Sequence, residues 1–173
     1  MGVDFAYAPA HLYTYMSQSV RATYYSPAIA QLYRDGMPNQ CRFVRKLVEA
    51  GGPIMAGTDA LVPGIALHGE IRALAACGVS NFEAMKAATA TPGRWFAIYK
   101  PDAERFGTVE AGKSADLALF EANPTANLSN LDRISAVVTA GRWLDRAELG
   151  RRLQDLPRRN AQEIARLKAA AAK

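Results

Sequence analysis

The sequence predicts an α/β protein, and three observations support this fold class. Apolar side chains recur at the spacing of amphipathic helices within residues 39–98. The apolar run IMAG, bounded by turn residues, interrupts these helices as a short buried strand would. Residues 107–145 carry short apolar runs separated by glycines, which is typical of strands. The 173 residues are 50% hydrophobic and 21% charged, as expected for one globular domain rather than a disordered, collagen-like or disulfide-scaffold chain.

The chain divides into four segments by composition. They are a Tyr- and Pro-rich segment at 1–38, an αβ segment at 39–100, a β-rich segment at 101–145 and a basic helical tail at 146–173. In the first segment we expect only a short helix from Pro27 to Asp35, ended by Gly36 and Pro38.

The second segment is expected to begin with a helix from Gln40, because Phe43, Val44, Leu47 and Val48 share one face. The Gly-Gly-Pro sequence at 51–53 ends this helix. A buried strand from Pro53 to Gly57 should follow, with the polar pair Thr58-Asp59 at its carboxyl end.

Two further helices and a short third one complete the αβ segment. The first has Leu67, Ile71, Leu74 and Ala75 on one face and ends at Gly78. The second begins at Ser80, which forms a capping box with Glu83. A short helix from Pro92 to Ile98 starts with proline in its first turn.

The β-rich segment contains four strand-like runs. TVEAG and ADLALFE flank Gly112-Lys113, and the alternation in the second run suggests a strand buried on both faces. ISAVVTA and RWLD, joined through Ala140-Gly141, are expected to form a hairpin.

The net charge of +5 is confined to the end of the chain. Residues 151–173 contain seven basic and two acidic side chains, which account for the whole excess. The rest of the chain is neutral, so we expect neither a nucleic-acid nor a membrane partner. The sequence has no run of 18 apolar residues, so no transmembrane helix is expected. The N-terminus does not resemble a signal peptide, and any signal peptide would have to be encoded upstream of Met1. Cys41 and Cys77 are too few and too far apart in the sequence to predict a disulfide framework. Cys77 is interpreted as a small core residue. The low number of cysteines makes the cytoplasm the default location.

Asp59 is the strongest candidate for chemistry on physical grounds. It follows a predicted parallel strand, and active sites of βα proteins are built at that end of strands. A carboxylate there can ligate a divalent metal or accept a proton from metal-bound water. The alternative is that Asp59 caps the following turn or helix, and spacing alone does not separate the two interpretations.

Five ordered segments between Val44 and Asp145 give the sequence a family resemblance. IMAGTDA, PGIALHGEI, GVSNFEAMKAATATPGRWF, FGTVEAGKSADLALFEANP and ISAVVTAGRW resemble the C-terminal part of the metal-dependent amidohydrolase superfamily, with imidazolonepropionase-like enzymes most similar. The resemblance implies the C-terminal portion of a (β/α)8 TIM-like barrel plus strands of a small β-sandwich, as a composite domain. Residues 53–59 then match the last barrel strand, 68–77 the last barrel helix, and 107–120 and 134–144 the sandwich.

The resemblance also implies roles for individual residues. Asp59 matches an aspartate that binds metal and transfers the proton of the attacking hydroxide, so it is both the catalytic and the metal-ligating candidate. His68 and Glu70 match a segment near the substrate, although a lone histidine at a helix start is more often a packing or capping residue. Asp116 matches an acidic residue of the sandwich with a structural role. His11 has no counterpart.

The chain departs from the family pattern in its metal ligands. It has two histidines and no HxH pair, whereas a catalytic zinc usually has three protein ligands. A divalent metal, with zinc expected, therefore belongs to a complete enzyme only. A full barrel takes about 250 residues, so the chain resembles the last third of such an enzyme.

Two functions follow from these observations. The first is a C-terminal fragment of a hydrolase acting by metal-activated water on carbon–nitrogen bonds other than peptides, with a small amide or cyclic amide as substrate, inactive as the isolated chain. The alternative is a non-catalytic remnant or association domain that pairs with another chain, by self-association or with a missing N-terminal portion.

Overall fold

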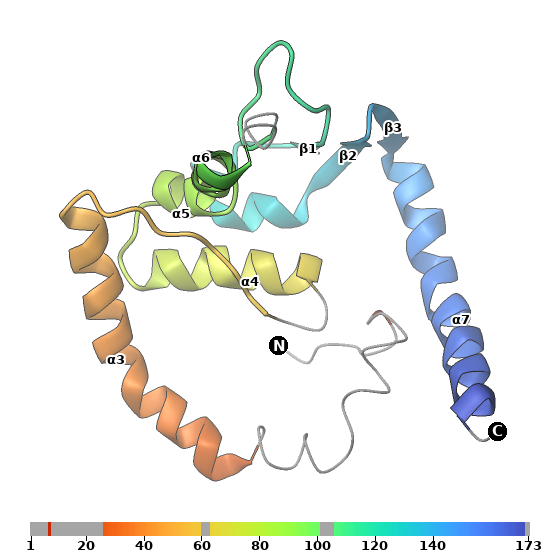
Figure 1. Cartoon of the computed structure of the whole chain (residues 1–173), viewed down its shortest axis with the longest axis horizontal. Coiled ribbons are helices and arrows are strands. Elements are labelled where there is room, and N and C mark those ends of the chain that lie inside the picture. Colours follow the sequence, from red (N-terminus) through yellow and green to blue (C-terminus); the bar gives the residue numbers. More distant parts are fainter. Residues whose placement is uncertain (1–6, 8–25, 60–62, 101–105, 172–173) are drawn as a thin grey trace.

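The computed structural model of the chain describes residues 7, 26–59, 63–100 and 106–171. These residues form five α-helices, a short 3-10 helix and a three-stranded antiparallel sheet, an arrangement compatible with the α/β class. The elements are α3 (Pro27–Glu49), α4 (Pro63–Ala76), α5 (Asn81–Ala87), α6 (Ala90–Tyr99), β1 (Leu117–Phe120), η3 (Leu128–Asp132), β2 (Ile134–Thr139), β3 (Arg142–Asp145) and α7 (Arg146–Ala171). Figure 1 shows α3 and α7 extending from opposite sides of the remaining elements.

Helix α3 is one continuous helix, not the two that the sequence predicted. Ser26 caps it by accepting a hydrogen bond from the Ile29 N–H at 3.3 Å. Gly36 and Pro38, which were expected to end a first helix, both lie inside α3. Proline removes one helical hydrogen bond and lowers local stability, and the helix nevertheless continues on both sides of Pro38.

Cys41 and Cys77 form a disulfide, although two cysteines are too few and too far apart in the sequence to predict one. Their Cα atoms lie 4.6 Å apart, and 36 positions of sequence separate them. Cys77 is therefore not simply a small core residue; the bond joins α3 to the end of α4. Separation along the chain does not limit a disulfide, since only the distance and direction of the two Cβ atoms do so.

Residues 53–58 are extended (Figure 1), but residues 53–59 form no strand within the described residues, contrary to the prediction for Pro53–Gly57. Burial alternates along them as in a strand with one covered face. The Ala56 N–H donates to the Ala87 carbonyl at 2.9 Å rather than to a neighbouring strand. The expected parallel sheet is absent from the described part of the chain, because a ladder requires an adjacent strand.

The helices after this segment follow the sequence closely. Helix α4 ends before Gly78, whose φ of +94° suits glycine. Ser80 caps α5 by accepting from the Glu83 N–H at 3.2 Å. The Glu83 carboxylate bonds Lys86 Nζ at 2.8 Å, so this side chain stabilises the helix by an ion pair. Helix α6 begins at Ala90, two residues before the expected Pro92.

The core is a small apolar cluster between the helices. Its buried members are Ile71, Val79, Ala84, Leu128 and Leu131. Partly buried side chains from α3, residue 54 and β1 pack against this cluster. Many large apolar side chains stay outside it, including Phe82, Ile98 and Tyr99 at 60%, 72% and 68% exposure.

The sheet has the order β1-β2-β3 and confirms the predicted hairpin. Ala140 and Gly141 make its turn with φ of 48° and 76°, the positive values that two-residue hairpin turns need. The Asp116 carboxylate accepts from the Ala140 N–H at 2.7 Å and so ties this turn to the start of β1. This contact agrees with the structural role that the resemblance implied for Asp116.

Two expectations for the first strands were wrong. TVEAG forms turns rather than a strand. In β1, Leu117 and Leu119 are partly buried, but Ala118 between them is exposed, so the strand is covered on one face only. A bulge between Leu119 and Phe120 shifts its register on β2, and there the Ser135 hydroxyl donates to the Leu119 carbonyl at 3.2 Å.

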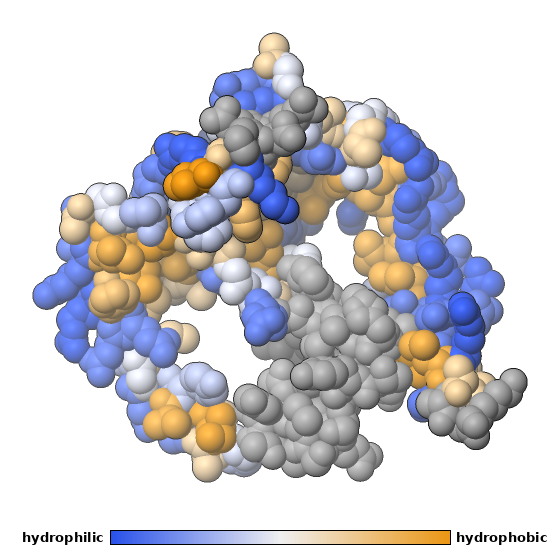
Figure 2. All heavy atoms as spheres, in the orientation of Figure 1, coloured by the Kyte–Doolittle hydropathy of each residue, from blue (hydrophilic) through white to orange (hydrophobic). Residues whose placement is uncertain are grey.

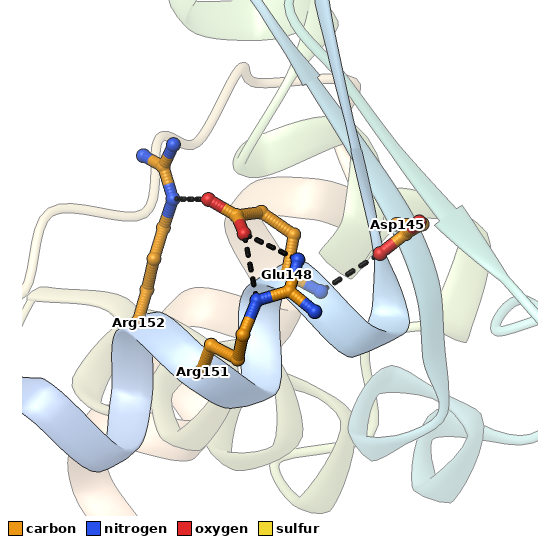
Figure 3. Close-up of polar contacts among 4 residues, drawn as sticks. All are labelled: Asp145, Glu148, Arg151 and Arg152. Carbon is orange, nitrogen blue, oxygen red and sulfur yellow. Dashed lines mark hydrogen bonds and ion pairs between the residues drawn. The ribbon is translucent and has the colours of Figure 1, made fainter.

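Helix α7 begins directly after β3 with a side-chain cap. The Asp145 carboxylate accepts from the Glu148 N–H at 2.7 Å, and the Glu148 carboxylate bonds Arg151 and Arg152 at 2.7 and 2.6 Å (Figure 3). Hydrogen bonds from Arg152 and Arg151 lower the pKa of Glu148 below its ordinary value. The helix then runs away from the sheet (Figure 1), through Pro157. No helix in the described ranges has the length and apolar character needed to cross a membrane.

The contact between Asp116 and the hairpin turn generates a stability prediction. Asp116→Ala removes the acceptor of the Ala140 N–H, and we expect the free energy of unfolding to fall by about 1 kcal/mol. Asp116→Asn keeps an acceptor oxygen and should lose less. Urea unfolding followed by circular dichroism measures both, and equal losses for the two variants would contradict the proposed bond.

Candidate functional site

Asp59 ends the extended segment and is exposed. Its φ of 45° lies in the left-handed region, which aspartate tolerates better than most residues and which marks a turn. Its side chain forms no hydrogen bond or ion pair with the described residues, so the carboxylate is open to an external partner. Helix α4 begins at Pro63, which places Asp59 four residues before the helix and outside its cap position.

Glu70 holds the backbone that leads to Asp59. Its Oε1 accepts a hydrogen bond from the Gly57 N–H at 3.0 Å, across 13 residues of sequence. The preceding N–H, that of Ala56, donates to Ala87 on the other side. Two consecutive amides of the segment are thus bound to α4 and α5, and Glu70 acts as a positioning residue for the chain just before Asp59.

His68 lies in a different environment from Glu70. Its Nδ1 is 3.9 Å from Asp132 Oδ1, and Arg72 Nη2 reaches the same carboxylate oxygen at 2.7 Å. Arg72 also bonds the Leu128 carbonyl at 3.4 Å. The three side chains form a polar cluster between α4 and η3, in which Arg72 and Asp132 are an ion pair. The structure therefore separates His68 from the segment that Glu70 binds.

Burial decides the protonation of His68. Desolvation lowers the pKa of His68 below its ordinary value of 6.5, the positive charge of Arg72 lowers it further, and Asp132 opposes both. The side chain keeps 26% of its exposure. Neutral imidazole is the form that the fold favours near pH 7, so His68 can donate one hydrogen bond and accept another.

A cavity of about 540 Å³ opens between α4, the α5–α6 region and β1. Its walls are chiefly apolar, with Leu67, Met85 and Phe120 among them. His68 and Asp116 add polar groups to its lining, whereas Asp59 and Glu70 do not line it. The size and apolar walls fit a small organic molecule, but this cavity is distinct from the segment that ends at Asp59.

The described residues do not fit a metal ion. No three His, Cys, Asp or Glu side chains gather closely enough among them to hold one. Asp59 offers one carboxylate, and His68 and Glu70 are engaged elsewhere. A catalytic zinc usually has three protein ligands, so no reaction step through a metal follows from this part of the chain.

Sequence reasoning missed the partners of His68. Arg72 stands four residues after His68, which places both on one face of α4, and this spacing could have indicated the pair. Asp132 is 60 residues from Arg72. Only the packing of η3 against α4 brings it near, and no local pattern points to that contact.

Removing the Glu70 carboxylate should loosen the segment before Asp59. We expect Glu70→Ala to increase hydrogen exchange of the Gly57 amide and to cost about 1 kcal/mol of stability. Glu70→Gln, which keeps an acceptor, should retain most of the protection. NMR-detected hydrogen exchange measures this, and unchanged protection of Gly57 in Glu70→Ala would contradict the role of Glu70.

The lowered pKa of His68 predicts a pH dependence of stability. Below about pH 6.5 the unfolded chain binds a proton at this side chain more readily than the folded chain, so the free energy of unfolding falls as the pH drops through that value. The decrease levels off below the folded-state pKa. Between about pH 7.5 and 5, His68→Gln should show a smaller decrease than the unmodified chain in urea titrations, and identical slopes would refute the assignment. His11 is present in both proteins and cancels in the comparison.

Comparison with known proteins assigns the chain to a family. The model of the Amidohydrolase family matches residues 27–144, more than half of the chain. Searches of curated proteins and of solved structures find no significant match. The matched region contains α3 to β2 and all of β3 but its last residue, and thus Asp59, Glu70 and the His68 cluster. The chain therefore belongs to the Amidohydrolase family.

Proposed function

We propose that this chain is the C-terminal part of a hydrolase that acts on carbon–nitrogen bonds other than peptides, with a small amide or cyclic amide as substrate. Membership of the Amidohydrolase family supports hydrolysis of such bonds. The observation that carries the proposal is the position of Asp59, an exposed carboxylate without a partner among the described residues, at the end of a segment bound on both sides. Such a group can accept a proton and return it to a leaving nitrogen.

The same proposal assigns the surrounding elements. Residues 53–59 and α4 would form the last βα unit of a (β/α)8 barrel, and β1 to β3 would contribute to a small sandwich. The alternating burial of residues 53–59 supports this assignment, since it is the pattern of a strand with one face covered. The hydrogen bonds that Glu70 and Ala87 accept from the Gly57 and Ala56 amides would then fix the position of Asp59 at the carboxyl end of the strand.

The remaining machinery would come from other polypeptide. Asp59 could supply one ligand to a divalent metal, with zinc expected, but the described residues form no site of their own. The isolated chain should therefore hydrolyse no amide substrate. Glu70 would position the backbone before Asp59, because it binds the Gly57 amide. His68 would support the packing of α4 on η3, because it lies beside Asp132.

Exposed apolar surface favours a second candidate, an association domain that pairs with another chain. Figure 2 shows apolar side chains over α3 and along the edge of α7 that faces the rest of the molecule. Phe43 and Leu32, both on α3, are 68% and 67% exposed, and exposed apolar patches mark association surfaces. Both functions require a partner polypeptide. Only the hydrolase requires the Asp59 carboxylate for its activity.

The decisive first experiment is to sequence the DNA directly upstream of the Met1 codon. If an open frame there encodes an HxH pair, the joined protein should hydrolyse amides in the presence of zinc. Asp59→Asn should then lower kcat by about 10²–10⁴-fold while circular dichroism stays unchanged. Asp35→Asn, which changes an exposed carboxylate on α3, is the matched control and should keep full activity.

The other outcomes favour the association domain. A stop codon with no such frame, or full activity in Asp59→Asn, would show that Asp59 takes no part in hydrolysis.

For the chain by itself, calorimetric titration with zinc should give equally weak binding before and after Asp59→Asn. Tight binding that Asp59→Asn abolishes would instead mean that residues outside the described part complete a metal site.

A further inference from the structure

The attachment of α3 to the rest of the molecule is uneven along its length. Val44 and Val48, near its C-terminal end, pack against the apolar core. No residue of α3 is fully buried, and Leu32 and Tyr33 in the N-terminal half are 67% and 61% exposed. Figure 1 shows this half running away from α4. Among the residues that the structure describes, apolar packing against the core therefore holds the end of α3 and not its beginning.

Polar contacts do not hold the N-terminal half either. Within the described ranges, its side-chain hydrogen bonds join residues of the same helix. Gln31 bonds Asp35 at 2.6 Å, Arg34 bonds Gln31 at 2.7 Å, and Arg42 bonds Asn39. Gly36 and Pro38 both weaken the helix at this place, so the half has little stability of its own.

The disulfide lies at the boundary between the two halves. Cys41 stands three residues before Val44, and Cys77 follows the last turn of α4. Both cysteines are partly exposed, so a small reductant can reach the bond. The Arg45 side chain lies against Gly78, the residue after Cys77, and its positive charge favours a thiolate at the freed sulfur.

We propose that the Cys41–Cys77 disulfide is a redox-dependent attachment of α3. When it is formed, α3 is fastened to the end of α4. When a dithiol reductant is present, its thiolate attacks one sulfur and forms a mixed disulfide, and its second thiol then displaces the other cysteine. The protein gains two thiols, the reductant becomes a disulfide, and two electrons and two protons pass to the protein. Residues 27–40 then unwind, because the bond no longer fixes their C-terminal end to α4.

The proposal is independent of catalysis. Val44 and Val48 still pack against the core after reduction, and the Gly52 N–H still donates to the Leu47 carbonyl at 2.9 Å. The end of α3 and the turn that leads from it to residues 53–59 therefore keep their contacts. Reduction alters the start of α3 and leaves Asp59 in place. The outcome does not depend on whether the chain takes part in hydrolysis.

Limited trypsin digestion of the full chain, with and without dithiothreitol, tests the proposal. Mass spectrometry would follow cleavage after Arg34 and Arg42 in α3 and after Arg142 in the sheet. Reduction should speed cleavage after Arg34 and Arg42 by about tenfold or more, because proteolysis follows the population of the open form. Cleavage after Arg142 should change by less than about twofold.

Two controls complete the design. The Cys41→Ser/Cys77→Ser variant should be cleaved in α3 at the fast rate whether or not dithiothreitol is present. Iodoacetamide should label no cysteine of the untreated protein and two after reduction. Should this double variant not fold, the reduced unmodified chain gives the same comparison.

Three results would overturn the proposal. Labelling of both thiols in protein purified without reductant would show that the bond is not formed. Equal cleavage after Arg34 in both redox states would show that the bond does not control α3. Acceleration after Arg142 as large as that after Arg34 would show that the disulfide maintains the whole fold rather than one helix.

Discussion

The apolar cluster beneath α4 is the constraint on which the rest of the structure depends. Ile71 of α4, Ala84 of α5 and Leu131 of η3 are almost completely buried together, at 3%, 0% and 1% exposure. Burying a side chain such as Leu131 contributes roughly 1.5–3 kcal/mol. Because α3, residue 54 and β1 pack against the same cluster, this one contact region orients most of the described elements. It is small, which explains why a disulfide and several side-chain caps accompany it.

Helix α4 distributes its polar residues to two sides of this core. His68 and Arg72 are one helical turn apart and meet Asp132 on η3. Glu70 lies between them in sequence but points to another face, where it binds the Gly57 amide. Residues two apart on a helix face different directions. The LHGE sequence therefore serves two contacts, one with the 3-10 helix and one with the segment that ends at Asp59.

Backbone hydrogen bonding explains why Asp59 is held although no strand lies beside its segment in the described residues. Backbone amides that form no helix or sheet bond need other partners, and those of the partly buried Ala56 and the exposed Gly57 find them in the Ala87 carbonyl and the Glu70 carboxylate. The segment keeps an extended conformation through these two bonds. Asp116 acts in the same way on the hairpin turn, where its carboxylate satisfies the Ala140 amide. In both places an acidic side chain positions backbone, and neither acidic side chain needs a metal for that.

The sequence by itself determined the local features of this protein. Helix α4 and its end at Gly78, the Ser80 cap and the hairpin at Ala140-Gly141 follow from signals within one or two turns of chain. The family resemblance was also readable, and the family match over residues 27–144 confirms it; the role of Asp59 that it implied stays a prediction. Tertiary structure alone decided the Cys41–Cys77 bond, the contact of Asp132 with α4 and the continuity of α3 through Pro38. It also decided that residues 53–57 pair with no strand of the described part of the chain. All of these features depend on which segments, distant in the sequence, lie next to each other in the folded chain. The pattern of apolar residues along the sequence does not specify those contacts.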